Sequence, residues 1–118
     1  MDPRFANLPE GHPRRRMEEQ RIAQQSDPAW VAAEVERRAQ AALDAFAKTR
    51  GYDGIMSACT YAGSVVPRFA AEGQCAVNLR DATWSACYQI MAAVKSGDRA
   101  MPTVDEVISE LPQLEWAP

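Results

Sequence analysis

The sequence predicts an all-α protein: a small helical bundle preceded by an extended, proline-rich N-terminal arm. Apolar residues recur at spacings of three and four over long segments, no segment alternates with the period of a strand, and helix start and stop signals bound the apolar segments. We divide the chain into an arm (residues 1–16), a short helix and linker (17–27) and a helical domain (28–118).

Proline defines the arm. Three prolines in residues 1–16 remove backbone donors and block a regular helix, so the segment is expected to be extended. Phe5 and Leu8 are its large apolar side chains. They are the residues that would anchor the arm on the surface of a partner.

Strong helix formers dominate residues 14–25, RRRMEEQRIAQQ, but few of them are apolar. The segment predicts a short helix that needs a neighbour for stability. Arg14, Arg15 and Arg16 open it, and nearby acidic residues nearly cancel their charge. A solvated helix start explains the three arginines; docking to an acidic protein surface and phosphate binding are the alternatives.

The first long helix is expected from residue 28 to 49. Ser26-Asp27-Pro28 combines a capping side chain with a proline in the first turn, and Gly51 supplies a stop signal. The apolar face contains Trp30 and many alanines, so helix backbones could approach closely. This composition suits a tight helix pair or a small oligomeric bundle.

The stretch RGYDGIMSACTYAGSVVPRF, residues 50–69, combines hydroxyl, thiol and glycine residues as an active-site loop would. We interpret it as a short helix that Asp53 caps and that runs to about Tyr61, followed by a tight corner before Pro67. Tyr52 and Tyr61 are its strongest candidates for contact with a partner, because tyrosine is enriched at interfaces.

A second long helix is expected over residues 68–96, ending at Gly97. It carries two adjacent apolar stripes, which predict the central, most buried helix of the domain. The stripes are Leu79, Thr83, Ala86, Ile90 and Val94, and Val77, Trp84, Tyr88 and Met91. Beyond it, Thr103 and Glu106 form a capping box for a helix to about Leu111, and Trp116 is expected to fold back onto the bundle.

The residues that carry chemistry do not form a catalytic or metal-binding pattern. Cys59, Cys75 and Cys87 contain no CxxC pair, and the one histidine, His12, lies in the arm. A nucleophile needs a base held within hydrogen-bond reach, and a zinc site needs clustered ligands. We therefore expect free thiols, no metal, no cofactor and no enzymatic activity.

Charge limits the classes of partner. The formal net charge is −3, and residues 51–118 contain eight acidic against four basic residues. This balance does not support nucleic-acid binding, which needs a basic face. The sequence contains no run of 18 apolar residues, so no membrane span is predicted. The first residues lack the apolar segment of a signal peptide.

The block GYDGIMSACTYAGSVVPRFAAEGQCAVNLRDATWSACYQIM, followed by MPTVDEVISELPQLEW, resembles a family of small, mostly uncharacterised bacteriophage proteins encoded among tail and tail-fibre genes. The resemblance covers roughly residues 40–118. It implies a virion-associated role, with assembly in the host cytoplasm, and it brings no catalytic residues with it.

These observations lead to a hypothesis of a virion structural protein of the tail, neck or fibre-attachment region. Its partners would be other phage structural proteins, and it would act as a homo-oligomer or in several copies. The alternatives are a tail-fibre assembly chaperone and a small phage regulatory binding protein. The residues that we select for partner binding are Phe5, Leu8, Arg14, Arg15, Arg16, Trp30, Tyr52, Tyr61 and Trp116.

Overall fold

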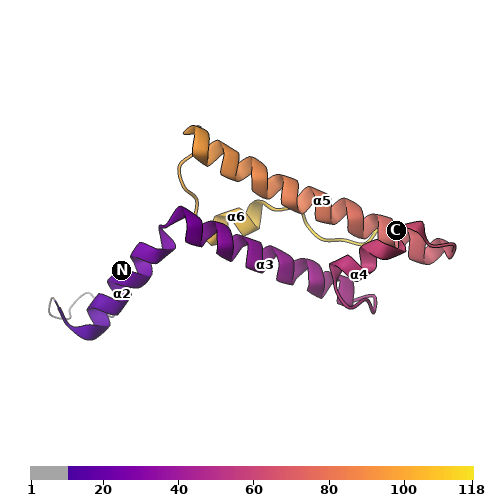
Figure 1. Cartoon of the computed structure of the whole chain (residues 1–118), viewed down its shortest axis with the longest axis horizontal. Helices are drawn as coiled ribbons and strands as arrows, with labels where there is room; N and C mark the ends of the chain where they lie inside the picture. The colour runs from indigo at the N-terminus through magenta and orange to yellow at the C-terminus, as the bar shows by residue number, and fades with distance from the viewer. Residues whose placement is uncertain (1–10) are drawn as a thin grey trace.

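A computed structural model describes residues 11–118 of the chain and confirms the all-α prediction, since no strand occurs in that range (Figure 1). The helices are α2 (Pro13–Gln25), α3 (Pro28–Lys48), α4 (Ile55–Cys59), α5 (Pro67–Ser96) and α6 (Val104–Glu110), with a short 3₁₀ helix, η1 (Thr60–Gly63), between α4 and α5.

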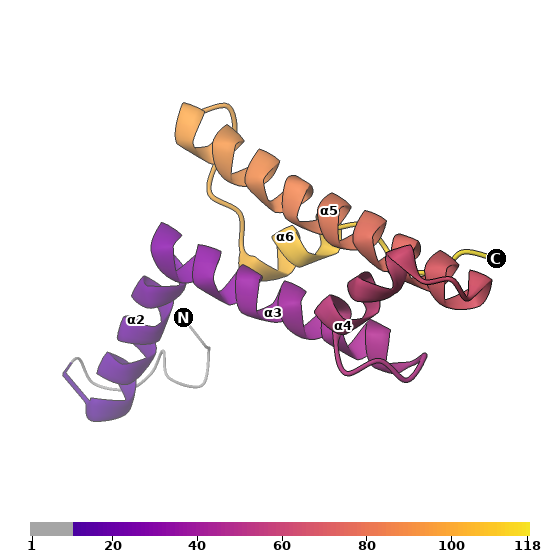
Figure 2. The same ribbon diagram turned by 45° about the vertical axis from the view of Figure 1, so that its right-hand side comes forward.

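Helices α3 and α5 run in opposite directions and form a V (Figure 1, Figure 2). Helix α4 and η1 join them at the narrow end, and α6 lies between them toward the open end. The C-terminal tail then returns to the narrow end. Helix α2 projects from the start of α3 and touches no other helix of the described chain. The result is an elongated molecule that measures 66 × 33 × 20 Å.

The predicted end of the arm is wrong, because Pro13 already begins α2. Proline is well suited to the first turn of a helix, where no backbone donor is needed. The Nδ1 atom of His12 accepts a hydrogen bond from the backbone N–H of Arg14 at 3.2 Å, and its carbonyl accepts one from Arg16 at 3.0 Å. The N-terminal part of the arm, including Phe5 and Leu8, lies outside the described residues.

The limits predicted for the first long helix are confirmed to within one residue. Asp27 accepts a hydrogen bond from the backbone N–H of Ala29 at 2.9 Å, as expected of a capping carboxylate. The chain leaves α3 through Gly51, whose φ of 88° lies in the left-handed region that favours glycine.

The predicted cap of the short helix is wrong. Gly54 and not Asp53 precedes α4, and no side chain next to it in sequence caps the helix. Instead, the Asp44 carboxylate on α3 accepts the backbone N–H of Ile55 at 2.9 Å and the side-chain amide of Gln40 at 3.2 Å. A long-range hydrogen bond therefore fixes the start of α4 against the last turns of α3.

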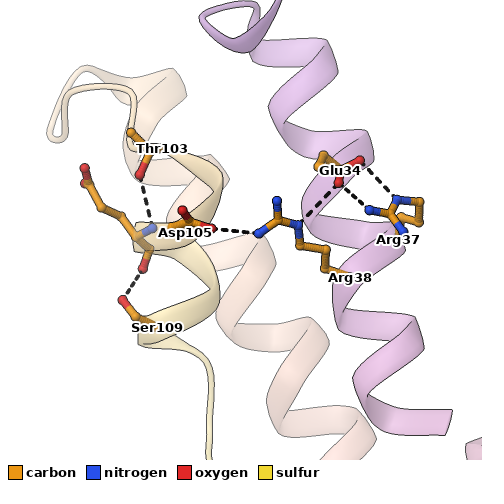
Figure 3. A network of polar contacts seen from close by, with 7 residues as sticks. Glu34, Arg37, Arg38, Thr103, Asp105 and Ser109 are labelled. Carbon is orange, nitrogen blue, oxygen red and sulfur yellow. Dashed lines mark hydrogen bonds and ion pairs between the residues drawn. The ribbon is translucent and has the colours of Figure 1, made fainter. Parts of the chain in front are cut away.

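One of the two hydrogen bonds of the predicted capping box of α6 is confirmed. Thr103 Oγ1 accepts the backbone N–H of Glu106 at 3.1 Å (Figure 3). Across the open end, Arg38 on α3 donates to Asp105 at 2.7 Å and to Glu34 at 3.3 Å. These are surface pairs that stabilise little individually. Of the two, the Arg38–Asp105 pair joins α6 to α3, whereas Arg38–Glu34 lies within α3.

The buried core is small and consists of two separate clusters. One lies at the narrow end and contains Leu43, Ala47, Ile55, Ala58 and Ala76; the other lies at the open end and contains Val31, Val35, Val104 and Val107. Helix α3 spans both clusters and contributes five buried residues.

The prediction that α5 is the most buried helix is therefore wrong. Over 30 residues, α5 buries only Glu72, Gly73, Ala76 and Thr83. Its second apolar stripe is partly open to solvent, and Tyr88 on that stripe is 76% exposed. The reason is geometric: the V opens along α5, so one face of the helix has no neighbour within the described chain.

Candidate functional site

The narrow end of the V gathers the aromatic and charged side chains that the sequence marks as candidates. It is built from the last turn of α3, the loop at residues 49–54, η1, the first turns of α5 and the C-terminal tail. We call it the corner.

A buried carboxylate organises the corner. Glu72 is 7% exposed and accepts hydrogen bonds from Arg50 Nη1 at 2.7 Å and from the Tyr52 hydroxyl at 3.2 Å. Arg68, one turn earlier on α5, lies 3.6 Å away from the same carboxylate. Glu72 thus ties the loop after α3 to the start of α5.

These contacts decide the protonation states in the corner. Burial raises the pKa of Glu72, but the hydrogen bonds from Arg50 and Tyr52 and the charges of the two arginines outweigh it, so the pKa is lowered overall. Burial, followed by the hydrogen bond to Glu72 and its charge, raises the pKa of Tyr52. The pair is therefore an ionised acceptor and a protonated donor at neutral pH.

Replacing Glu72 with glutamine is expected to lower the free energy of unfolding at pH 7 by about 1–2 kcal/mol, because a charged hydrogen-bond acceptor is lost. The pKa of Glu72 is lower in the folded than in the unfolded chain, so its contribution is present above its ordinary pKa of 4.5 and is lost as the pH falls through the lowered value. Urea unfolding from pH 7 to pH 3 should show the two proteins converging below about pH 4.5. A difference that stays constant with pH would contradict this role.

A chain of aromatic contacts crosses the corner from the tail to the surface. Trp116 stacks on Phe46 with 4.2 Å between ring centroids, and its indole N–H donates to Thr49 Oγ1 at 3.0 Å. The predicted return of Trp116 to the bundle is thus confirmed. The guanidinium of Arg50 lies 5.1 Å from the Trp116 ring centroid, as in a cation–π contact.

Two further contacts continue this chain outward. The ring centroids of Tyr52 and Tyr61 are 5.3 Å apart, and those of Tyr61 and Phe69 are 5.6 Å apart with the rings edge to face. Such pairs are favourable beyond their buried area. The outermost rings, Tyr61 and Phe69, are 39% and 38% exposed.

Next to these rings lies an exposed apolar turn. Val65 is 97% exposed and Val66 is 41% exposed. The turn is ordered by local bonds: Ser64 Oγ accepts the backbone N–H of Val66 at 3.1 Å, and the Val66 carbonyl accepts that of Ala70 at 2.9 Å. We call Tyr61, Val65, Val66 and Phe69 the corner patch.

Gly73 allows the corner to close. A Cβ atom at this position would lie 2.2 Å from the backbone nitrogen of Ala62 and 2.5 Å from the carbonyl carbon of Tyr61. Only glycine permits this approach of η1 to α5, and that approach sets the position of Tyr61 beside Phe69.

The structure separates the residues selected for partner binding into three groups. Arg14, Arg15 and Arg16 lie on α2, where Arg15 donates to Glu19 at 3.1 Å. Three aromatic residues pack within the fold: Trp30 against the cluster at the open end, and Tyr52 and Trp116 at the corner. Tyr61 belongs to the exposed corner patch.

The thiols are free and half-buried. Burial is the main cause that raises the pKa of Cys59 and of Cys87, so both are protonated at neutral pH and are weak nucleophiles. Within residues 11–118, no group of three or more His, Cys, Asp or Glu side chains converges as metal ligands would. No helix of that range is long and apolar enough to cross a membrane.

Comparisons with protein-family models, with curated proteins and with solved structures found no match for the chain. The resemblance to phage tail proteins therefore stays a prediction.

Sequence reasoning selected Tyr61 and considered Phe69 as an aromatic candidate, but it missed Val65, Val66 and the role of Glu72. The sequence did contain one sign of an exposed apolar turn, the pair Val65-Val66 directly before Pro67. Two β-branched apolar residues in a turn are unusual, because turns favour glycine, proline and small polar residues.

Proposed function

We propose that this protein is a non-enzymatic docking subunit of a bacteriophage particle, in the tail, neck or fibre-attachment region, and that the corner patch binds a neighbouring subunit. The observation that carries the proposal is the exposure of Val65 and Val66 on an ordered turn beside two half-exposed aromatic rings.

Leaving apolar side chains in water costs free energy that burial at an interface would recover. Tyrosine and phenylalanine rings beside apolar side chains are typical of the centre of a protein interface. The turn is held by its own hydrogen bonds and leads directly into α5, so little conformational entropy would be lost on binding. An apolar socket on a folded neighbour is the partner that such a protrusion fits.

The resemblance of residues 40–118 to phage tail and tail-fibre proteins supplies the biological setting. In that setting the N-terminal arm, with Phe5 and Leu8, and the arginines Arg14, Arg15 and Arg16 would add a second contact with an adjacent subunit. A tail-fibre assembly chaperone is the alternative, because it would use the same apolar surface before the particle is complete.

The test compares two variants in a phage whose own copy of the gene is deleted. Val65→Asp/Val66→Asp places two charges in the patch, and Ala82→Asp/Ser85→Asp places two charges on exposed positions of α5 as a matched control. We expect the patch variant to be recovered in purified particles at least ~10-fold less than wild type, since hot-spot changes cost more than 1.4 kcal/mol. The control variant should be incorporated normally.

Quantitative mass spectrometry of purified particles and circular dichroism of each variant provide the measurements. Equal incorporation of the patch variant would refute the docking surface. A wild-type chain that is expressed in infected cells but absent from particles would refute the virion role and favour the chaperone.

A further inference from the structure

A second surface lies far along the V from the corner. A groove of about 430 Å³ runs between α3 and α5, with α6 contributing to its floor. Val35 and Val107 line its base and are buried, whereas Trp84, Cys87 and Met91 form a half-buried wall on α5.

This groove explains the second apolar stripe of α5. Trp84, Tyr88 and Met91 belong to that stripe, and all three line the groove. Tyr88 stands at its edge, 76% exposed. Within the described chain, Trp84 is partly covered by the cluster at the narrow end, whereas Tyr88 is left largely open to solvent.

The charges on the groove favour a second copy of the chain over a strongly charged ligand. Glu36 lies on the α3 side and Arg80 on the α5 side. Neither side chain forms an ion pair within residues 11–118. The groove is therefore neutral overall, with one charge of each sign. A two-fold-related copy presents the same pair of charges, so an isologous contact can match each with its opposite.

The chain also exposes more surface than a compact protein of its mass. The chain exposes 7859 Å², whereas a compact monomer of 13.0 kDa would expose about 6,300 Å². A standard interface buries about 800 Å² on each partner. This excess is spread over the whole chain, α2 included, and it is larger than one partner's share of a standard interface.

We propose that the groove between α3 and α5 is the interface of a homodimer, in which Tyr88 of each copy packs into the groove of the other. The two copies then complete a helical bundle that a single chain leaves open along α5. This inference concerns a different surface from the corner patch and does not depend on the phage role.

The test measures the mass of the full-length chain in solution. Sedimentation equilibrium and light scattering under reducing conditions should show a dimer, twice the 13.0 kDa chain mass, within a range of about 1–100 μM. Tyr88→Glu should raise the dissociation constant at least ~10-fold, because two carboxylates would be buried in apolar surroundings. Gln89→Glu adds the same charge at a neighbouring exposed position outside the groove and should leave the dimer unchanged.

A wild-type chain that stays monomeric throughout this range would overturn the proposal. So would a dimer that Tyr88→Glu leaves intact while its helical circular dichroism is unchanged. The corner variant Val65→Asp/Val66→Asp should still dimerise. If that variant were monomeric, the corner would be the surface for self-association and the groove would not.

Discussion

Replacing Gly73 with alanine is expected to lower the free energy of unfolding by about 3 kcal/mol, as overpacking against fixed atoms does. The added Cβ would lie 2.2 Å from a backbone atom of Ala62 and 2.5 Å from one of Tyr61, and neither can rotate away. In an ordinary helix interior the same change stabilises by about 1 kcal/mol. The sign of the effect therefore reports on the close approach of η1 to α5.

Urea unfolding followed by circular dichroism measures this effect, and Gly63→Ala is the matched control. Gly63 has no atom within 4 Å of an added Cβ, so its substitution should change stability by less than about 0.5 kcal/mol. If Gly73→Ala were as stable as wild type, the packing of the corner described above would be incorrect.

Replacing Trp116 with alanine should cost about 3 kcal/mol, because the tail would lose its main contact with α3. The change removes the stacking on Phe46, the hydrogen bond to Thr49 and the contact with Arg50. Without this anchor, we expect the tail after residue 112 to exchange its amide protons rapidly, while α3 stays protected.

Trp116→Phe separates the contribution of the ring stacking from that of the hydrogen bond to Thr49. It keeps an aromatic ring over Phe46 but removes the N–H that donates to Thr49, so it should cost only about 1 kcal/mol. Equal stability of Trp116→Ala and wild type in urea would show that the tail does not close the corner.

The parts of the fold that short-range chemistry controls were predictable. Asp27 before Pro28 begins α3, Thr103 caps α6, and Gly97 ends α5 with a φ of 83°. Each is a signal contained within a few residues. The helix predicted over residues 14–25 begins one residue earlier, at Pro13. The arm was extended too far, to residue 16, because the cap is a histidine, which is not a preferred capping residue.

The features that needed tertiary structure were not predictable. The cap of α4 comes from Asp44, which lies 11 residues before the N–H that it accepts. Nothing local distinguishes it from the acidic residue at position 53. Gly73 is a similar case: a glycine inside a helix pattern indicates a close approach, but the sequence does not say which segment approaches.

The two apolar stripes of α5 show why the sequence overestimated how much of this helix is buried. A broad apolar surface predicts that a helix is buried, yet it does not say whether the covering surface belongs to the same chain. Ile90 on one stripe packs against the cluster of α3 and α6 residues at the open end, whereas Tyr88 on the other stripe is largely exposed. The homodimer proposed above would resolve this difference, since the partner copy would supply the missing cover.

The candidate site was partly predictable. Aromatic composition pointed to residues 50–69, and Tyr61 is exposed there. The ion pair of Glu72 with Arg50 joins residues 22 positions apart, and such a pairing cannot be read from the sequence. Trp30, which was selected as a contact residue, packs partly buried against the cluster at the open end, since interface and core residues share the same chemistry.

The central claim is that the corner patch docks this chain onto a neighbouring subunit of a phage particle. Cryo-electron microscopy of the intact particle tests it most directly. We predict density for the V of α3 and α5, with Val65 and Val66 buried against an apolar surface of an adjacent protein. A particle that contains the chain with its corner facing solvent, or a particle without the chain, would contradict the claim.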